Sequence, residues 1–480
     1  MTYKTANTFT HVQTTPEANW VIPHNLSNSF PIVTTWIEGE GGVVTTLLPS
    51  TGGGDEPTLL HIIDNPNAFG SSAGDEFGYS TSISGNYAIV ASVEDDSYNR
   101  LKSGKVYLFD VTTGALLRTL DNPNGFGTSS DDNFGWTLSI SGDYAIVGAY
   151  KEDESGSTTS GKAYIFDVTT GALLHTIDNP NIYGTPANDR FGYSTSISGN
   201  YAIVGTTGEY QGGGVVYVFD VTTGTLLRTL DNPNAFDTSY GDRFGYSTAI
   251  SGNYAIVTAN AEDDAGGLDS GKVYIFDVTT GTLLHTLDNP NAYGTSASDY
   301  FGTSLAISDT HAIVGAHNED DASGPASGNV YIFDVATGAL LHTLDDPNAY
   351  GTGHGDYFGV SVSISGNYVI VGAHIEDEEP TRTDTGIAYI FDVTTGALLH
   401  TIGNPNAYGT SANDRFGISV SISGNYVIVG AESEDDASGS ASGKAYIFEL
   451  SGPDGAVEVN TPNTATISFN APTIGTVNIS

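Results

Sequence analysis

Short runs of alternating apolar and polar residues recur along the chain, each bounded by turns rich in glycine, asparagine or serine. In one representative stretch this pattern predicts four strands, near residues 135–141, 144–149, 163–167 and 172–177. Period-two alternation and frequent β-branched or aromatic residues favour strands over helices. The turns at 141–143 and 168–171 carry the Gly, Asp and Thr residues typical of hairpins. Each such unit should therefore form a four-stranded antiparallel sheet.

This unit repeats. The motif Asp-x-Phe-Gly recurs seven times at intervals of 53 to 58 residues. Seven four-stranded sheets predict an all-β fold, a seven-bladed β-propeller. We expect the aspartate to stabilise a turn, the phenylalanine to pack in the blade core and the glycine to allow close backbone approach. The motif residues are Asp75, Phe77, Gly78, Asp132, Phe134, Gly135, Asp189, Phe191, Gly192, Asp242, Phe244, Gly245, Asp299, Phe301, Gly302, Asp356, Phe358, Gly359, Asp414, Phe416 and Gly417.

The two ends of the repeat region are complementary. Residues 58–64 predict a fourth strand with no third strand before it, and residues 444–449 predict a third strand with no fourth strand after it. Because a propeller must cover the edges of its first and last blades, these two strands should pair and close the ring. We therefore expect a propeller over 57–451, inserted into a small β-sandwich formed by 1–56 plus 452–480.

Charge narrows the possible partners. The chain has 56 acidic and 14 basic residues, a formal net charge of −42, so nucleic acid and anionic membrane surfaces would be repelled. The sequence contains no apolar run of about 20 residues, so it does not predict a membrane-spanning helix. It also contains no cysteine, which excludes disulfides and thiolate metal sites. Motifs of common hydrolases and nucleotide-binding enzymes are missing, and the carboxylates recur as repeats instead of forming one unique pair, so we expect no enzymatic activity.

Acidic clusters follow the second strand of most units, on the face that also carries the links between units. Loops on a rigid scaffold commonly bind ligands, so we take as candidate binding residues Glu94, Asp95, Asp96, Glu319, Asp320 and Asp321. Clustered carboxylates also suit a hard cation, and calcium is the one cofactor considered. The candidate metal residues are Asp263, Asp264, Asp320, Asp321, Asp435 and Asp436. The alternative interpretation is that these carboxylates are simply solvated.

An aromatic residue follows the Asp-Asn-Pro-Asn link of each unit on the same face. Aromatic rings beside carboxamides and carboxylates suit sugar stacking, whereas their regular period equally suits packing between blades. The candidate binding residues of this kind are Tyr183, Tyr293, Tyr350 and Tyr408.

The segments Asp-x-Phe-Gly-x-Ser, Ala-Ile-Val-Gly-Ala and Ser-Gly-Lys-Ala-Tyr-Ile-Phe resemble the FG-GAP repeats of integrin α-subunit heads and many microbial surface proteins. The resemblance implies a seven-bladed propeller and a role in adhesion. One departure concerns metal binding, because the Asp-x-Asp-x-Asp-Gly calcium loop of integrin-type repeats is replaced here by a short Ser-Gly-Asn turn.

The termini resemble a small β-domain of bacteriophage tail-fibre and other virion proteins. The resemblance rests on residues 18–26 (ANWVIPHNL), 31–37 (PIVTTWI) and 463–476 (NTATISFNAPTIGT), although an expected aspartate of the second strand is replaced within 36–40. It implies a virion structural protein, a tail fibre, spike or other appendage on the outside of the particle. The terminal domain would contact other virion proteins, and the protein would be oligomeric there.

In that setting the propeller would bind a host-surface glycan or protein, or neighbouring subunits. Three alternatives stay open: a capsid or tail decoration protein without host binding, a bacterial surface or secreted adhesion module, and a polysaccharide-degrading enzyme. Near-identical blades argue against the last, because catalysis usually needs one asymmetric group of residues.

Overall fold

We analysed a computed structural model of the chain. It describes residues 56–66, 74–95, 102–124, 131–153, 158–180, 187–233, 241–263, 268–290, 297–320, 326–347, 355–377, 384–405, 413–435 and 440–450. Within the terminal segments it describes only short strands: β1 (Thr2–Tyr3), β2 (Phe9–Thr10), β3 (Asn19–Ile22), β4 (Thr34–Thr35), β5 (Thr45–Thr46), β34 (Ile467–Asn470) and β35 (Gly475–Ile479).

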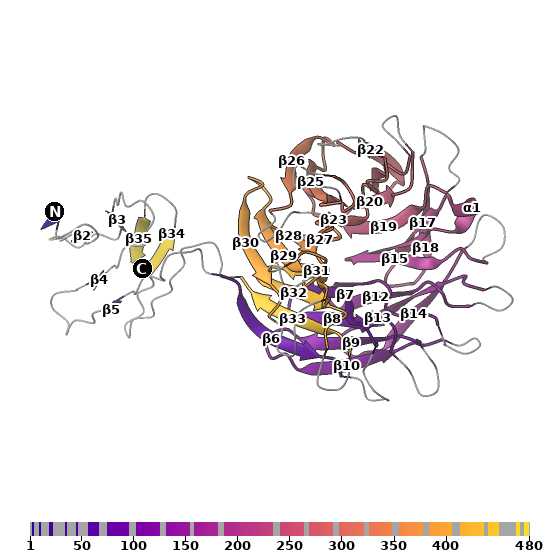
Figure 1. Ribbon diagram of the computed structural model, residues 1–480, viewed down its shortest axis with the longest axis horizontal. Coiled ribbons are helices and arrows are strands. Elements are labelled where there is room, and N and C mark those ends of the chain that lie inside the picture. The colour runs from indigo at the N-terminus through magenta and orange to yellow at the C-terminus, as the bar shows by residue number, and fades with distance from the viewer. Residues whose placement is uncertain are drawn as a thin grey trace. The chain divides into compact units, whose positions relative to one another are not determined.

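Seven four-stranded antiparallel sheets form a β-propeller, which confirms the predicted fold class (Figure 1). Blade one contains β7 (Phe77–Ser84), β8 (Tyr87–Ser92), β9 (Lys105–Asp110) and β10 (Leu116–Asp121). Blade two contains β11 (Leu138–Ser141), β12 (Tyr144–Ala149), β13 (Lys162–Asp167) and β14 (Leu173–Asp178). Blade three contains β15 (Phe191–Ser198), β16 (Tyr201–Thr206), the short helix α1 (Glu209–Gly212), β17 (Val215–Asp220) and β18 (Leu226–Asp231).

The other blades repeat this order. Blade four contains β19 (Phe244–Ser251), β20 (Tyr254–Ala259), β21 (Lys272–Asp277) and β22 (Thr282–Asp288). Blade five contains β23 (Ser304–Ile307), β24 (His311–Ala316), β25 (Asn329–Asp334) and β26 (Leu340–Asp345). Blade six contains β27 (Ser361–Ser365), β28 (Tyr368–Ala373), β29 (Ile387–Asp392) and β30 (Leu398–Gly403). Blade seven combines β31 (Phe416–Ser423), β32 (Tyr426–Ala431) and β33 (Lys444–Glu449) with β6 (Thr58–Asp64).

Blade seven confirms the predicted closure of the ring. β6, from the start of the repeat region, is the fourth strand of this blade and pairs with β33 from its end. Ile63 packs with Ala445 and Ile447, and the ammonium of Lys444 forms an ion pair with Asp64. Residues almost four hundred positions apart thus complete one hydrophobic core, and the edges of the first and last blades are covered.

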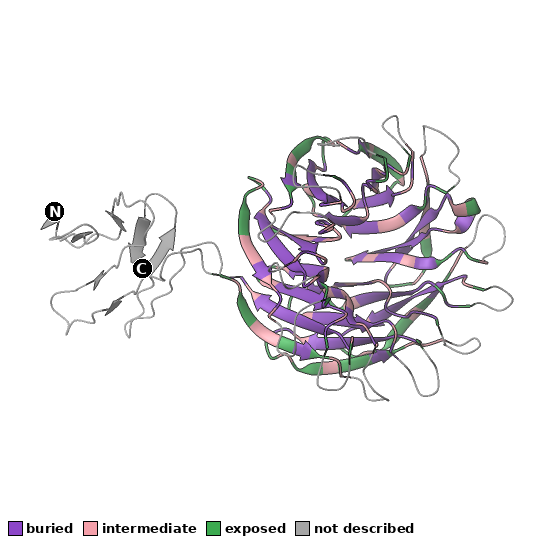
Figure 2. Cartoon of the chain, in the orientation of Figure 1, coloured by how far each residue is buried: buried purple, intermediate pink, exposed green. Residues whose placement is uncertain are grey.

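The blades pack face to face through their middle strands, which are buried on both sides (Figure 2). This explains why strands such as β12 and β13 are almost continuously apolar instead of alternating. Between blades one and two, Phe134 lies in a cluster with Val106 and Leu108. Its ring makes edge contacts with Tyr164 and Phe166 at centroid distances of 5.8 and 6.1 Å. The outer strands are more exposed, so the core lies between adjacent blades.

The glycine of the Asp-x-Phe-Gly motif brings neighbouring backbones together. Gly192 has a φ of +86°, and a Cβ atom placed on it would lie 2.4 Å from the carbonyl oxygen of Lys162 in the preceding blade. Further inter-blade hydrogen bonds form near the axis, where the Ser194 hydroxyl donates to the Gly245 carbonyl at 2.8 Å. At the perimeter the Arg228 guanidinium donates to the Thr279 carbonyl at 2.7 Å. The ring is therefore tied together at its inner and outer strands.

The two ends of the chain are grouped in a second compact unit, 1–58 plus 450–480, separate from the propeller unit at 59–449. Within it, β3 pairs with β35, and β35 pairs with β34, so the first and last segments share a sheet. β1 pairs with β2, and β4 with β5. No helix in the described part of the chain is long and apolar enough to cross a membrane.

Substituting the motif glycine should destabilise the ring beyond the cost of its backbone conformation. Gly192→Ala and Gly199→Ala both place a side chain at positive φ, which costs roughly 1–2 kcal/mol. At Gly199 nothing lies within 4 Å of the added Cβ, whereas at Gly192 it meets a backbone carbonyl. Guanidinium denaturation should show Gly192→Ala to be less stable than Gly199→Ala by about 1–3 kcal/mol. Equal stabilities would contradict the close-approach role.

Candidate functional site

One carboxylate in each loop between the second and third strands is buried, not exposed. It lies under its loop and accepts a hydrogen bond from a tyrosine hydroxyl of the third strand in the same blade, at 2.5–2.8 Å. The pairs are Asp95–Tyr107, Glu152–Tyr164, Glu209–Tyr217, Glu262–Tyr274, Glu319–Tyr331, Glu376–Tyr389 and Glu434–Tyr446. Each carboxylate residue has a relative exposure of 0%. We call these seven residues the loop-base carboxylates.

This burial corrects two of the predicted binding residues. Asp95 and Glu319 were expected on an exposed rim, but as loop-base carboxylates neither can touch a ligand on the surface. The Lys105 ammonium lies 2.7 Å from Asp95, and the Asn329 amide donates to Glu319 at 3.1 Å. The interpretation of these two residues as solvated carboxylates is wrong for the same reason. An ionic or hydrogen-bonding partner replaces the water that a buried carboxylate loses.

Burial also changes their protonation. Removal from water raises the pKa of Glu152 and of Glu434 to about 8, and that of Glu262 to about 7, although the tyrosine hydroxyl and the nearby lysine oppose the rise. These carboxyl groups therefore titrate near neutral pH in the folded protein.

In blades four, five and seven, the aspartate directly after the loop-base carboxylate holds the loop backbone. Asp263, Asp320 and Asp435 each accept a hydrogen bond from the backbone N–H six residues further on, at 2.9, 3.0 and 2.9 Å. Because these three lie in different blades, they do not converge on one metal ion. Glu94 is half-buried and forms an ion pair with Lys102 at 2.6 Å. Outside the described residues lie Asp96, Asp264, Asp321, Asp436, Tyr183, Tyr293, Tyr350 and Tyr408.

The aspartate of the Asp-x-Phe-Gly motif is hydrogen-bonded to the link between units. In six blades it accepts a hydrogen bond from the amide of the link asparagine at 2.8–2.9 Å. The pairs are Asn65–Asp75, Asn122–Asp132, Asn179–Asp189, Asn232–Asp242, Asn289–Asp299 and Asn404–Asp414. The aspartate thereby ties the link to the start of the blade.

The blades differ from one another at one end of the central axis, a region that was not predicted from the sequence. The innermost strands of all seven blades line a central channel of about 280 Å³. Three positions per blade lie on the loop face, near the ends of the first two strands: the residue inside Asp-x-Phe, the residue after Phe-Gly, and the residue directly after the second strand. We call this region the channel mouth. In blade order its residues are Glu76, Tyr79, Val93, Asn133, Trp136, Tyr150, Arg190, Tyr193, Thr207, Arg243, Tyr246, Asn260, Tyr300, Thr303, His317, Tyr357, Val360, His374, Arg415, Ile418 and Glu432.

Aromatic rings from four consecutive blades form one side of the mouth. Tyr79, Trp136, Tyr150, Tyr193 and Tyr246 are in successive contact, with centroid distances of 4.8 to 5.9 Å. All except Tyr150 are partly exposed. We call these five residues the aromatic arc. It offers a partly exposed aromatic surface that also contains tyrosine hydroxyls.

The other side of the mouth carries histidine, tyrosine, arginine and glutamate side chains beside Val360 and Ile418. The His317 ring packs against Tyr357 at 5.2 Å, and Tyr357 stacks on His374 at 5.9 Å. The Arg415 guanidinium donates to Glu432 at 2.9 Å. Beside Arg415 lies a hollow of about 370 Å³ that is also lined by the predicted metal residue Asp435.

Several buried polar atoms on this side form no hydrogen bond within the described residues. Burial lowers the pKa of His317 to about 4 and, together with Arg415, that of His374 to about 3, so both imidazoles are neutral at physiological pH. Among the described residues, nothing bonds Nδ1 of either histidine or Oε2 of Glu432. Burial and the charge of Glu432 raise the pKa of Glu76 to about 7. Buried polar atoms of this kind mark places where water or a ligand completes the bonding.

The fold and the mouth together define a repeat propeller with one chemically distinct opening. Comparison with known families gives seven matches to the FG-GAP repeat, at residues 68–109, 127–166, 184–219, 234–276, 291–333, 349–391 and 406–448. The chain belongs to the FG-GAP repeat family, whose propellers suggest an adhesion or recognition module. No curated protein matches the chain.

Neutralising one loop-base carboxylate should change how stability depends on pH. Because the pKa of Glu152 rises from 4.5 to about 8 on folding, its stabilising contribution is complete below pH 4.5 and is lost as pH rises through 8. We expect Glu152→Gln to match wild type near pH 5 and to be more stable near pH 9, measured by denaturant unfolding. The exposed turn variant Asp143→Asn serves as the control and should track wild type at both pH values. If the free energy of unfolding of Glu152→Gln differed from that of wild type by the same amount at both pH values, the raised pKa of Glu152 would be refuted.

Proposed function

We propose that this protein is a non-enzymatic recognition protein that binds a negatively charged carbohydrate at the channel mouth. The observation that carries the proposal is where the repeats vary. Middle strands, hairpins and loop-base carboxylates are nearly the same in every blade, whereas the mouth positions include aromatic, basic, acidic and imidazole side chains. A purely architectural ring would not need this diversity at its axis.

The aromatic arc supports a sugar ligand. Flat, partly exposed rings in a continuous row can stack on the C–H faces of sugar rings while the tyrosine hydroxyls bond to sugar hydroxyls. Such rings lose little conformational entropy on binding, since Tyr79, Trp136, Tyr193 and Tyr246 already hold one another in place.

The arginines support a negative charge on that sugar. Basic residues are scarce in this chain, yet Arg190, Arg243 and Arg415 all occupy the position before Phe-Gly at the mouth. Arg190 and Arg243 are exposed and belong to the same blades as Tyr193 and Tyr246. Guanidinium groups pair with carboxylates in a bidentate geometry, so uronic or sialic acid residues would be held beside the aromatic arc.

We further propose that the terminal unit attaches the propeller to a larger particle, a bacteriophage virion appendage. Support comes from the resemblance of the termini to virion β-domains and from the pairing of β3 with β35, which joins both chain ends in one unit. Immunogold labelling with an antibody against the propeller, applied to virus particles and host cells of one culture, tests this. Label on cell surfaces and not on particles would favour the bacterial adhesion module instead.

Binding can be followed through Trp136, the one tryptophan between residues 59 and 449. Titration with acidic oligosaccharides should change its fluorescence saturably, whereas neutral analogues should bind at least about tenfold more weakly, as expected for loss of a charged hydrogen bond. Arg243→Ala should reduce affinity for the acidic ligand by about 10- to 100-fold. The perimeter variant Arg228→Ala removes the same charge away from the mouth and should leave affinity unchanged.

Equal binding of acidic and neutral sugars would refute the charge requirement. Equal losses in Arg243→Ala and Arg228→Ala would show that general electrostatics, and not the mouth, determines binding. Cleavage of the oligosaccharide during the titration would favour the polysaccharide-degrading enzyme.

A further inference from the structure

One position of the repeat carries buried polar atoms that form no hydrogen bond. It is the residue directly after the second strand, which is Val93 in blade one and Tyr150 in blade two. In the next five blades this residue is polar, and one of its side-chain atoms is buried without a hydrogen-bond partner within the described residues. These atoms are Thr207 Oγ1, Asn260 Oδ1, His317 Nδ1, His374 Nδ1 and Glu432 Oε2. Five consecutive blades thus have an unpaired polar atom at the channel mouth.

This position lies at the junction between its own blade and the next one. The Tyr150 ring of blade two is 5.3 Å from the Tyr193 ring of blade three. The His317 ring of blade five is 5.2 Å from the Tyr357 ring of blade six. Because the blades repeat one geometry, the same residue of every blade faces the start of the following blade.

The two junctions between blades four, five and six form an uncharged part of the mouth, which we call the neutral junctions. Their mouth residues are Asn260, Tyr300, Thr303, His317, Tyr357 and Val360. The His317 imidazole is neutral at physiological pH because burial lowers its pKa to about 4. Tyr300, Thr303 and Tyr357 are partly exposed. The two preceding junctions carry Arg190 and Arg243 instead, so uncharged and basic parts of the mouth are neighbours.

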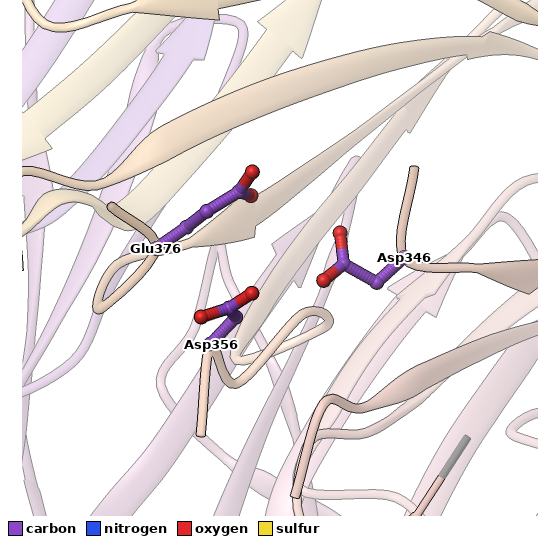
Figure 3. A group of neighbouring side chains, drawn as sticks. All are labelled: Asp346, Asp356 and Glu376. Atoms are coloured by element: carbon purple, nitrogen blue, oxygen red, sulfur yellow. The ribbon is translucent and has the colours of Figure 1, made fainter. Parts of the chain in front are cut away.

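The carboxylates of blade six do not supply a charge for a ligand at these junctions. Asp346, Asp356 and Glu376 lie close together (Figure 3), but they are only 6%, 7% and 0% exposed. Each of them also interacts with other groups of the protein. An ammonium group on a ligand would therefore lose its water at the neutral junctions without gaining a carboxylate partner. An uncharged ligand fits this part of the mouth better.

Hydroxyl groups match the unpaired atoms. The Oδ1 atom of asparagine accepts hydrogen bonds, and Nδ1 of a neutral imidazole accepts or donates one according to its tautomer. A buried polar atom without a partner is unfavourable, so a ligand hydroxyl that bonds to it gains free energy. The His317 ring is partly exposed, and a half-turn about its Cβ–Cγ bond would bring Nδ1 to the surface. Within the described residues, that turn breaks no hydrogen bond to Nδ1.

We propose that the neutral junctions bind an uncharged, hydroxyl-rich sugar unit. Its hydroxyls bond to Asn260 and His317, and its C–H face stacks on the partly exposed rings of Tyr300 and Tyr357. This inference rests on the proposed binding of an acidic carbohydrate, because it adds a second subsite beside the first. Arg243 and Asn260 belong to the same blade, so the two subsites are adjacent. The ligand is then a mixed oligosaccharide with acidic and neutral units.

The test measures the affinity of the full-length protein for two tetrasaccharides by calorimetry at pH 7. In one tetrasaccharide glucuronic acid alternates with glucose, and the other is tetraglucuronic acid. Wild type should bind the alternating tetrasaccharide at least about tenfold more tightly, because a carboxylate at the neutral junctions would lose its water without gaining a partner.

Variants at the neutral junctions should remove this preference. Asn260→Val and His317→Val should each lower the affinity for the alternating tetrasaccharide by about 3- to 10-fold and leave that for tetraglucuronic acid unchanged. Both should fold, because valine occupies this position in blade one. Arg243→Ala should weaken the binding of both ligands. The matched control is Asn253→Val, the same substitution in an exposed turn at the other end of β20, and it should change neither affinity.

The outcomes distinguish the two proposals. Equal affinity of wild type for both tetrasaccharides, with a loss for both in Arg243→Ala, would overturn the neutral subsite and leave the acidic one standing. Tighter binding of tetraglucuronic acid, or an equal loss for both ligands in Asn260→Val, would overturn the neutral subsite as well. Binding of neither tetrasaccharide would refute the carbohydrate function itself, and the neutral subsite with it.

Discussion

The Phe-Gly pair at the start of each blade is the contact on which the molecule depends. Phe191 and its equivalents fill the core between blades, while the following glycine lets the chain pass against the carbonyl of the preceding blade. Any side chain there would push the innermost strands apart. Because the residues on either side of this pair are fixed at the axis, they are also the ones available to form the channel mouth. Architecture and recognition thus share one short motif.

Much of the fold could be predicted because its determinants are local. The alternation of apolar and polar residues predicts the strands, and the spacing of the Asp-x-Phe-Gly motif predicts the length of the repeat. The unmatched strands at 58–64 and 444–449 predict that the ring closes between them. The loop-base carboxylates could not be predicted in the same way. Glu152 looks like part of an acidic surface loop, and its partner Tyr164 looks like an ordinary core residue of a strand. Only the folded backbone shows that the hydroxyl meets the carboxylate away from water.

The channel mouth was not predicted from the sequence for a different reason. The positions that the repeats share are the easiest to notice in the sequence. Asp320 is one of them, and its carboxylate holds the backbone of its loop. A residue with a role in only one blade instead differs from the residues at the same position in the other blades. Trp136 is such a departure, and its contacts with Tyr79 and Tyr193 form only when neighbouring blades are placed around one axis. Comparing the repeats position by position would have identified it.

The closure of blade seven has a mechanical consequence. β6 begins, and β33 ends, where the chain passes between the propeller unit and the terminal unit. The two strands are antiparallel neighbours, so both connections leave from the same end of one sheet. Tension on the terminal unit therefore pulls both strands in one direction and does not shear or unzip the hydrogen bonds between them. A load on the terminal unit is therefore shared by two neighbouring strands of one blade.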